Sequence, residues 1–192
     1  VDRTTLLAEL TDPAAGGVSS EAVGARRPAA AAAMGEAALA SMFTAVATGM
    51  PIDTHGAKST GRIIAEAIAE HGLSDWLTAV RRHHEGTYQH CLLVTGVAID
   101  FGLSLGVPNA DIERLSSAAM FHDIGKAKVP LAILDKPGRL DREERALIET
   151  HPVAGYEVLK GTNGISPEIL EAVRHHHEYL DGSGYPHGLK NG

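Results

Sequence analysis

Hydrophobic residues recur every three or four positions along most of the chain, which is the repeat expected for one face of an α-helix. Glycine or proline interrupts this repeat at several points, and both residues are common where helices end. Residues 1–28 hold only a short apolar piece among glycines and proline, and we expect them to form a mobile lead-in. The rest of the pattern predicts helices over residues 29–48, 59–71, 76–85, 87–105, 110–121, 141–160 and 167–178.

Local signals refine these helices. Ser74 or Asp75 is the expected N-cap of helix 76–85, and Asp141 with Glu144 three positions later resembles a capping box. Pro152 removes one backbone donor inside helix 141–160, so we expect a bend beside His151. Helix 87–105 is expected to bury one apolar side, formed by Leu92, Leu93, Val97, Phe101 and Leu105.

Composition points to a fold class. Hydrophobic residues make up 44% of the chain but aromatic residues only 4%, and alanine is abundant. This balance favours packed helices over a β-sandwich, so the predicted fold is all-α. The 192 residues suffice for a compact domain with a smaller appendage. Three roles remain open for helices 29–48 and 59–71: capping the core, joining an upstream domain, or pairing with another chain in a homodimer.

The net charge and the first residues of the chain bear on its expected partners and location. The formal net charge of −7 argues against a broad DNA or RNA footprint, because nucleic-acid backbones are bound by clustered lysine and arginine. Cys91 is the single cysteine, so no disulfide can form within the chain. No apolar run approaches the ~20 residues that span a bilayer, and the first residues lack the order of a signal peptide. We expect a cytoplasmic protein without a membrane span.

The candidate chemistry lies in the histidines, of which there are 11. His122 and Asp123 are neighbours at the expected end of helix 110–121, where both side chains can reach one site if other segments close around them. Imidazole with carboxylate suits a first-row transition metal, and the two oxygens of Asp123 could bridge a pair of ions. Further histidines near helix ends or bends complete a predicted metal site of four separate segments: His90, His151, His176 and His177.

Lys126 stands three residues after Asp123. One interpretation is a lysine at a helix C-terminus, where the helix dipole favours it. The other, which we favour, is a cation beside metals that neutralises phosphate oxygens. The remaining histidines are expected outside the site, on the surface, at solvated helix ends, in the tail or turned to one side: His55, His71, His83, His84, His175 and His187.

Four motifs in order resemble the HD-GYP domain, a subgroup of the HD phosphohydrolase superfamily. They read HDIGKAKVP, ILDKPGRL with the acidic pair of DREE, THPVAGYEVL, and HHEYLDGSGYPHGLKNG. A lone His-Asp pair would be weak evidence for this resemblance, but four ordered motifs that end in an intact Gly-Tyr-Pro loop are specific for the HD-GYP group. The resemblance covers residues 82–192, so we divide the chain into an N-terminal helical region with its lead-in (1–81) and an HD-GYP domain (82–192).

The resemblance implies an HD-domain helical bundle with two or three divalent metal ions, iron in the first place and manganese as the alternative. The six residues of the predicted metal site match the family's ligands one by one, and Glu85 is a candidate ligand for a third ion. The implied activity is hydrolysis of the bacterial second messenger cyclic di-GMP to linear pGpG, to GMP, or to both. Asp123 and Lys126 would be the catalytic residues. Substrate would be contacted by Lys126, Asp181, Gly184, Tyr185 and Pro186.

Two departures from the family's pattern affect these expectations. Where the family commonly has an arginine three residues after the first histidine, this chain has Leu93. Family members also continue past the position of Gly192 into a helix with a further metal-binding aspartate, so we expect the chain ending there to be incomplete at its C-terminus and inactive.

The Gly-Tyr-Pro loop is implicated in the family in contacts with diguanylate cyclase (GGDEF) domains. Alternatives are hydrolysis of another cyclic dinucleotide or nucleotide, and a non-catalytic signalling module.

Overall fold

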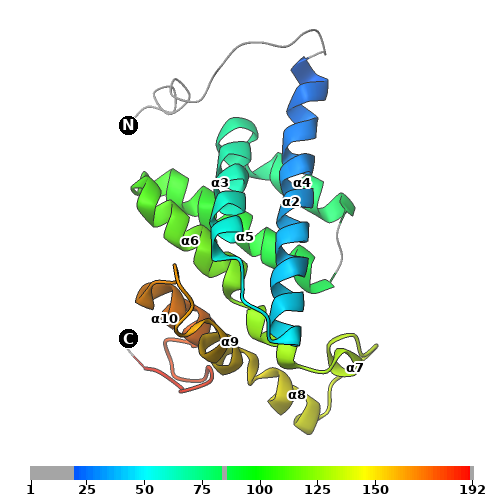
Figure 1. Ribbon diagram of the computed structural model, residues 1–192, viewed down its shortest axis with the longest axis vertical. Helices are drawn as coiled ribbons and strands as arrows, with labels where there is room; N and C mark the ends of the chain where they lie inside the picture. The colour runs from blue at the N-terminus through cyan, green and yellow to red at the C-terminus, as the bar shows by residue number, and fades with distance from the viewer. Residues whose placement is uncertain (1–19, 84–85, 191–192) are drawn as a thin grey trace.

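The computed structural model describes residues 20–83 and 86–190, with side chains from Arg27 onward except that of His83 (Figure 1). The described residues contain helices and no strand, and one isolated antiparallel bridge joins Asp181 to Lys190. The prediction of an all-α fold is confirmed. In chain order the elements are α2 (Ser20–Thr48), α3 (Thr54–His71), α4 (Leu73–His83), α5 (Gly86–Leu105), α6 (Asn109–Phe121), the 3-10 turn η1 (Ile124–Lys128), α7 (Leu131–Leu134), α8 (Arg142–Ile148), α9 (His151–Leu159) and α10 (Pro167–His175).

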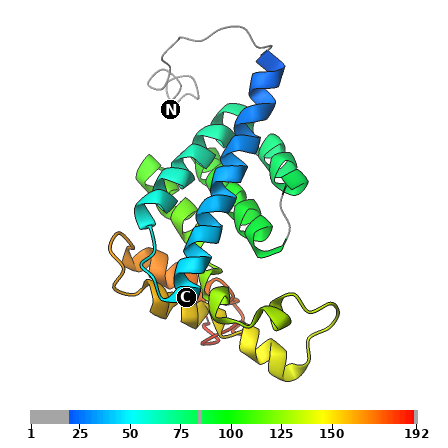
Figure 2. The same ribbon diagram turned by 45° about the vertical axis from the view of Figure 1, so that its right-hand side comes forward.

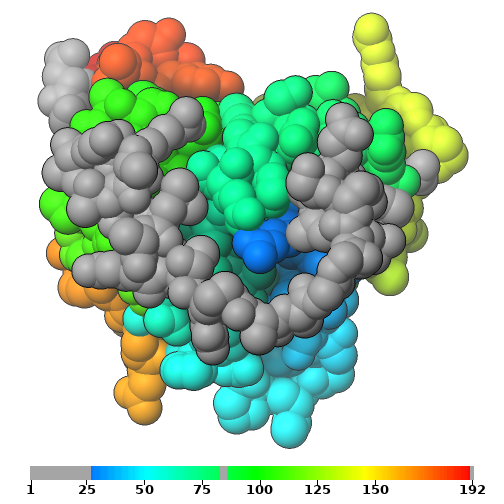
Figure 3. All heavy atoms as spheres, turned by 90° about the horizontal axis from the view of Figure 1, so that it is seen from above, coloured from blue at the N-terminus to red at the C-terminus, as the bar shows by residue number. Residues whose placement is uncertain are grey.

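The long helix α2 packs beside α3, α4 and α5, while η1, α9 and α10 lie toward its C-terminal end (Figure 1). Short helices α7 and α8 project from the side of the bundle (Figure 2, Figure 3). Leu39 of α2, Ile64 of α3 and Trp76 of α4 are fully buried in one core. That core also includes residues of α5 and α6, such as Ile99 and Met120. The division of the chain at residue 81 stays a prediction.

The indole of Trp76 makes a specific polar contact inside the core. The Nε1 of Trp76 donates a hydrogen bond of 3.1 Å to the carbonyl of Leu92. A Cβ at Gly96 would lie 2.1 Å from that Nε1, so the indole can reach α5 only over a glycine. Since a buried indole N–H without a partner is costly, this contact fixes how α4 lies against α5, the helix that carries His90 near its start.

Several helix boundaries follow the sequence signals. Gly49, Gly72 and Gly106 have φ of 73°, 84° and 66° directly after α2, α3 and α5, in the left-handed region that glycine tolerates. Asp141 and Glu144 form the expected capping box at the start of α8, each side chain accepting a 2.9 Å hydrogen bond from the other's backbone amide.

Other boundaries were wrong. Helix α2 already begins at Ser20 and contains Pro28, so residues 20–28 are helical, whereas residues 1–19 lie outside the described part. Helix α4 starts at Leu73, before both of its expected caps. The predicted helix 141–160 is two helices, because Pro152 lies in the first turn of α9, where a backbone donor would be unpaired anyway. Helix α10 ends at His175, two residues before His177.

The buried side of α5 was also predicted incorrectly. Val97, Phe101 and Leu105 are 51%, 60% and 62% exposed, whereas Leu92 and Ile99 are fully buried. Helix α5 is apolar around most of its circumference, so its hydrophobic pattern does not single out one face. The face that packs is the one that α4 and α6 cover, with Gly96 and Gly102 at close approach.

Within the described residues, one helical stretch, Arg27–Thr48, is long and apolar enough to cross a membrane by length and composition alone. The sequence analysis expected no such stretch. Core helices of folded proteins pass the same test, and Leu39, Met42 and Val46 are buried against the other helices. The stretch is therefore weak evidence for a membrane span.

Candidate metal centre

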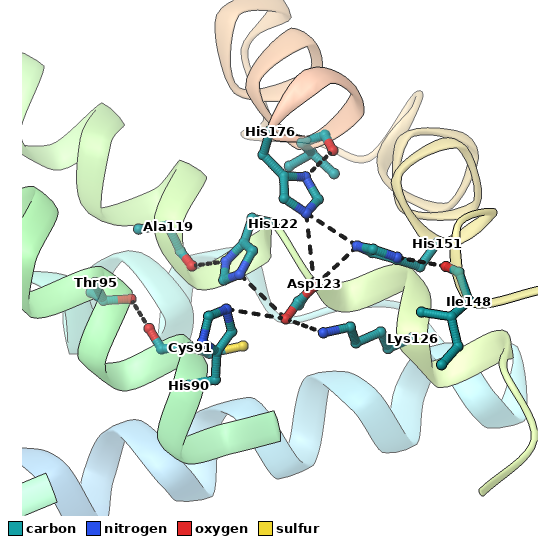
Figure 4. A network of polar contacts seen from close by, with 11 residues as sticks. His90, Cys91, Thr95, Ala119, His122, Asp123, Lys126, Ile148, His151 and His176 are labelled. Carbon is teal, nitrogen blue, oxygen red and sulfur yellow. Dashed lines mark hydrogen bonds and ion pairs between the residues drawn. The ribbon is translucent and has the colours of Figure 1, made fainter. Parts of the chain in front are cut away.

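Asp123 lies at the centre of a cluster of histidines from four segments of the chain (Figure 4). Its Oδ2 is 3.3 Å from Nε2 of His122 and 3.8 Å from Nε2 of His90. Its Oδ1 is 3.1 Å from Nε2 of His151 and 3.8 Å from Nε2 of His176. The side chain of Asp123 is only 1% exposed, so a charged oxygen pair sits inside the protein among imidazoles.

The backbone places these side chains by a tight turn and a close helix contact. His122 ends α6, and η1 then turns so sharply that Nζ of Lys126 returns to within 2.7 Å of Oδ2 of Asp123. A Cβ at Gly125 would lie 2.0 Å from the carbonyl oxygen of His151 and 2.5 Å from the amide nitrogen of Gly155. Only glycine permits this approach of η1 to α9, and the approach brings His151 to Asp123.

Three imidazoles are oriented by the same local contact. The Nδ1 atoms of His122, His151 and His176 lie 2.7, 2.7 and 2.8 Å from the backbone carbonyls three residues earlier. Because a carbonyl only accepts, each Nδ1 must carry the proton that it donates, and in the neutral ring Nε2 then keeps its lone pair. All three Nε2 atoms face Asp123, which is the arrangement that metal-ligating histidines use.

Burial and neighbouring charges shift the pKa values of three histidines and of Asp123. Burial lowers the pKa of His176 to about 3 and the pKa of His177 to about 4, and it also lowers the pKa of His90. Burial alone would raise the pKa of Asp123, but nearby His122, His151 and Lys126 hold it well below its ordinary value. His90, His176 and His177, whose pKa values are lowered, therefore lie beside an ionised carboxylate.

These residues fit divalent metal ions. The buried Nε2 of His122 and Oδ1 of Asp123 have no hydrogen-bond partner, so both atoms are available to a metal ion. Two donor groups have their atoms within 4.8 Å of one another, and Asp123 belongs to both. We call them the buried group (Asp123, His151, His176 and His177) and the open group (His90, His122 and Asp123). Nitrogen donors with one carboxylate suit first-row transition metals.

Comparison with known protein families agrees with this geometry. The family model of the HD domain matches residues 64–192. This chain belongs to the HD domain family. The matched residues begin at Ile64 in the second half of α3 and continue through α4 to α10.

Three curated bacterial proteins are similar in sequence to this chain. A cyclic di-GMP phosphodiesterase of Pseudomonas aeruginosa is 34% identical over 155 residues, which are 80% of this chain and 37% of that protein. The cyclic di-GMP phosphodiesterase response regulator RpfG of Xanthomonas campestris is 37% identical over 119 residues, 61% of this chain and 31% of that protein. A 3'3'-cGAMP-specific phosphodiesterase of Vibrio cholerae is 37% identical over 105 residues, 54% and 24% of the two chains.

The chain thus spans less than two fifths of the length of each of these relatives. Two of the three are named for cyclic di-GMP, and the chain has an intact Gly184-Tyr185-Pro186 sequence in the expected loop. The resemblance of this HD domain to the HD-GYP group, which the sequence motifs indicated, is confirmed.

The structure brings together the six predicted ligands and Lys126 of the HD domain. Glu85 and His84 lie outside the described residues. His175 and His187 contact each other at 3.1 Å between ring nitrogens, apart from the two donor groups, and His55 is exposed. The structure shows that the donor atoms of these side chains lie close together. Their roles as metal ligands stay predictions.

The Gly-Tyr-Pro loop of the HD domain lies against the buried group. The ring of Tyr185 stacks on His177, with 4.6 Å between centroids and 22° between planes. Burial raises the pKa of Tyr185 to about 12, so its hydroxyl stays protonated. Oδ1 of Asp181 accepts hydrogen bonds from the amide and the hydroxyl of Ser183, and these bonds form a turn. The contact of Asp181 with substrate stays a prediction. Sequence reasoning gave no role to Glu178, although it directly follows His177.

Proposed function

We propose that this chain hydrolyses the phosphodiester bonds of cyclic di-GMP, giving linear pGpG and then GMP. The observation that carries the proposal is the position of Asp123, whose two oxygens each face a different group of imidazole nitrogens. Such a shared carboxylate is suited to a pair of divalent ions. We propose iron as the resident metal and manganese as the alternative, because both accept nitrogen and carboxylate ligands together.

Bound metals would supply Lewis-acid polarisation of the phosphate and of a water molecule. The chain's own residues prepare the site for this chemistry. His122, His151 and His176 direct Nε2 toward Asp123 because each Nδ1 donates to a backbone carbonyl. Lys126 brings a positive charge beside Asp123, where it would offset charge on phosphate oxygens. The stacked Tyr185 offers an aromatic surface for a guanine base.

Cyclic GMP-AMP is the second candidate substrate. Three similar proteins of Vibrio cholerae, at 36%, 37% and 40% identity, are named 3'3'-cGAMP-specific phosphodiesterases. Both substrates have the same two phosphodiester linkages and differ in one base, so the metal centre alone would accept either. Discrimination would have to come from residues that contact the base.

The test is metal reconstitution followed by a hydrolysis assay on the natural polypeptide that contains these residues. After anaerobic loading with Fe(II) or Mn(II), elemental analysis and chromatography of products from cyclic di-GMP and 3'3'-cGAMP are measured in parallel. Replacing His122 and Asp123 with alanine should remove most of the bound metal and lower turnover by roughly 1,000-fold or more. The exposed His55→Ala serves as the control and should change neither. Unchanged hydrolysis by the double variant would refute the assignment.

A further inference from the structure

The carboxylate of Glu178 binds the backbone of the loop that follows it. Its Oε1 accepts hydrogen bonds from the amides of His187 and Gly188, at 2.6 and 3.2 Å. Its Oε2 accepts from the amide of Leu189 at 2.9 Å. Three successive amides thus converge on one carboxylate, and Gly188, with φ of 63°, allows the backbone to turn in this way.

The same loop is attached to residues 177–179 at a second point. The amide of Tyr185 donates a 3.2 Å hydrogen bond to the carbonyl of His177. A Cβ at Gly184 would lie 2.4 Å from that carbonyl oxygen and 2.4 Å from the amide nitrogen of Tyr179. Tyr185 and Pro186 therefore sit between two attachments, one at the backbone of His177 and one at the side chain of Glu178.

We propose that Glu178 is a positioning residue that holds Tyr185 against His177 and so fixes the aromatic side of the substrate site. The inference rests on the proposed function and extends it to a residue that makes no contact with the metal donors. A carboxylate that satisfies three amides orders a short loop more strongly than neutral acceptors do. Without it, the loop keeps the contact of the Tyr185 amide with His177, the bridge of Asp181 with Lys190 and the side-chain contact of His187 with His175, and the ring of Tyr185 is held less firmly in its stacked position.

Glu178 should affect the binding of a cyclic dinucleotide and not the cleavage of the phosphodiester bond. A cyclic dinucleotide needs the ordered aromatic surface, so loss of the clamp adds an ordering cost to binding. A small diester such as bis(4-nitrophenyl) phosphate has no nucleobase to place and needs only the metal centre and Lys126. Glu178 variants should therefore affect the two substrates differently, whereas damage to the centre would affect both.

The experiment compares wild type with Glu178→Ala, Glu178→Gln and the control Glu157→Ala in the metal-loaded protein. Glu157 is an exposed carboxylate of α9 with a lysine 4.0 Å away. Glu178→Ala should raise KM for cyclic di-GMP about tenfold and change kcat less than about threefold. Metal content and turnover of bis(4-nitrophenyl) phosphate should not change. Glu178→Gln, whose amide oxygen can still accept at one position, should fall between Glu178→Ala and wild type.

A second measurement keeps this test separate from that of the proposed function. Hydrogen exchange of the amides of residues 187–189, followed by mass spectrometry, needs no substrate, and Glu178→Ala should speed it relative to wild type. If wild type does not hydrolyse cyclic di-GMP but Glu178→Ala still speeds this exchange, the proposed function fails while the clamp stands. Unchanged exchange, an unchanged KM, or parallel loss of metal and of both activities would overturn the positioning role.

Discussion

The buried group and the open group share Asp123 but are built differently. In the buried group, His151 is 1% exposed and lies in the first turn of α9, held by the glycine contact between η1 and that helix. In the open group, His90 is 57% exposed near the start of α5. The buried group also offers four residues to an ion, against three in the open group.

This difference suggests unequal roles for two ions. Burial and prior orientation reduce the ordering cost of binding, so the buried group should hold its ion more tightly. The open group has fewer protein donors and faces solvent, so water or substrate can complete its coordination. Metal sites that perform chemistry keep such open positions, whereas closed sites are mainly structural. We expect substrate to enter from the side of His90.

The largest effect on metal binding should come from disrupting the contact between η1 and α9. Gly125→Ala would place a Cβ 2.0 Å from the backbone oxygen of His151, and backbone atoms cannot move aside as a side chain can. We expect a loss of about 3 kcal/mol in the free energy of unfolding, measured with urea, together with loss of metal from both groups.

Gly102→Ala is the matched control for this substitution. Its added Cβ would meet only ends of side chains at 3.2–3.4 Å, including Leu115 and Ile112. We expect its cost to stay below about 1 kcal/mol. Equal costs for the two variants would show that the contact between η1 and α9 is not what places His151.

Removing one histidine from each group should separate the two metal affinities. His151→Ala takes a buried ligand 3.1 Å from Oδ1 of Asp123 and should weaken the tighter site by roughly 100-fold or more. His90→Ala takes the exposed ligand of the open group and should weaken only the looser site. Anaerobic titration with Mn(II) against a competing chelator measures both. If His90→Ala abolished the tighter binding step, the assignment of affinities would be reversed.

Acid should destabilise the metal-free protein through the buried group. The pKa of His176 is lowered to about 3 and that of His177 to about 4, while histidine in an unfolded chain has a pKa of ~6.5. Between these values the unfolded chain binds more protons than the native protein, so the free energy of unfolding falls as pH drops from ~6.5 toward 4. Urea midpoints measured with a chelator should follow this slope, and His176→Asn should flatten it.

The metal donors were predictable because their chemistry is local to short motifs. Residues 122 and 123 are adjacent, and His151 and His176 each lie near a helix end whose Pro or Gly signals are visible in the sequence. What the sequence did not reveal was the means of bringing them together. The contact of Gly125 with α9 depends on backbone atoms far apart in the chain, and a glycine in a motif does not say what packs on it.

Glu178 shows a second limit of the same kind. Beside His177 an acidic residue reads as a possible ligand or as a surface charge, and its actual partners are three backbone amides. Backbone amides are present at every position, so no residue type nine to eleven places later could indicate them. The acidic side chain followed by a glycine-rich loop was the only available signal.

The smallest effect is expected for Phe101→Ser on the exposed side of α5, where Phe101 lies eleven residues, about three helical turns, after His90 and therefore on the same side of the helix. Ile99 is fully buried, so Ile99→Ala should cost about 2–5 kcal/mol. Phe101, 60% exposed, should cost less than about 0.5 kcal/mol when replaced by serine, whose helix propensity is similar. Urea unfolding of both variants measures the difference, and Phe101→Ser should retain metal in both groups. A cost for Phe101→Ser as large as that for Ile99→Ala would mean that another surface covers this face in solution, and the open group would then border an interface and not solvent.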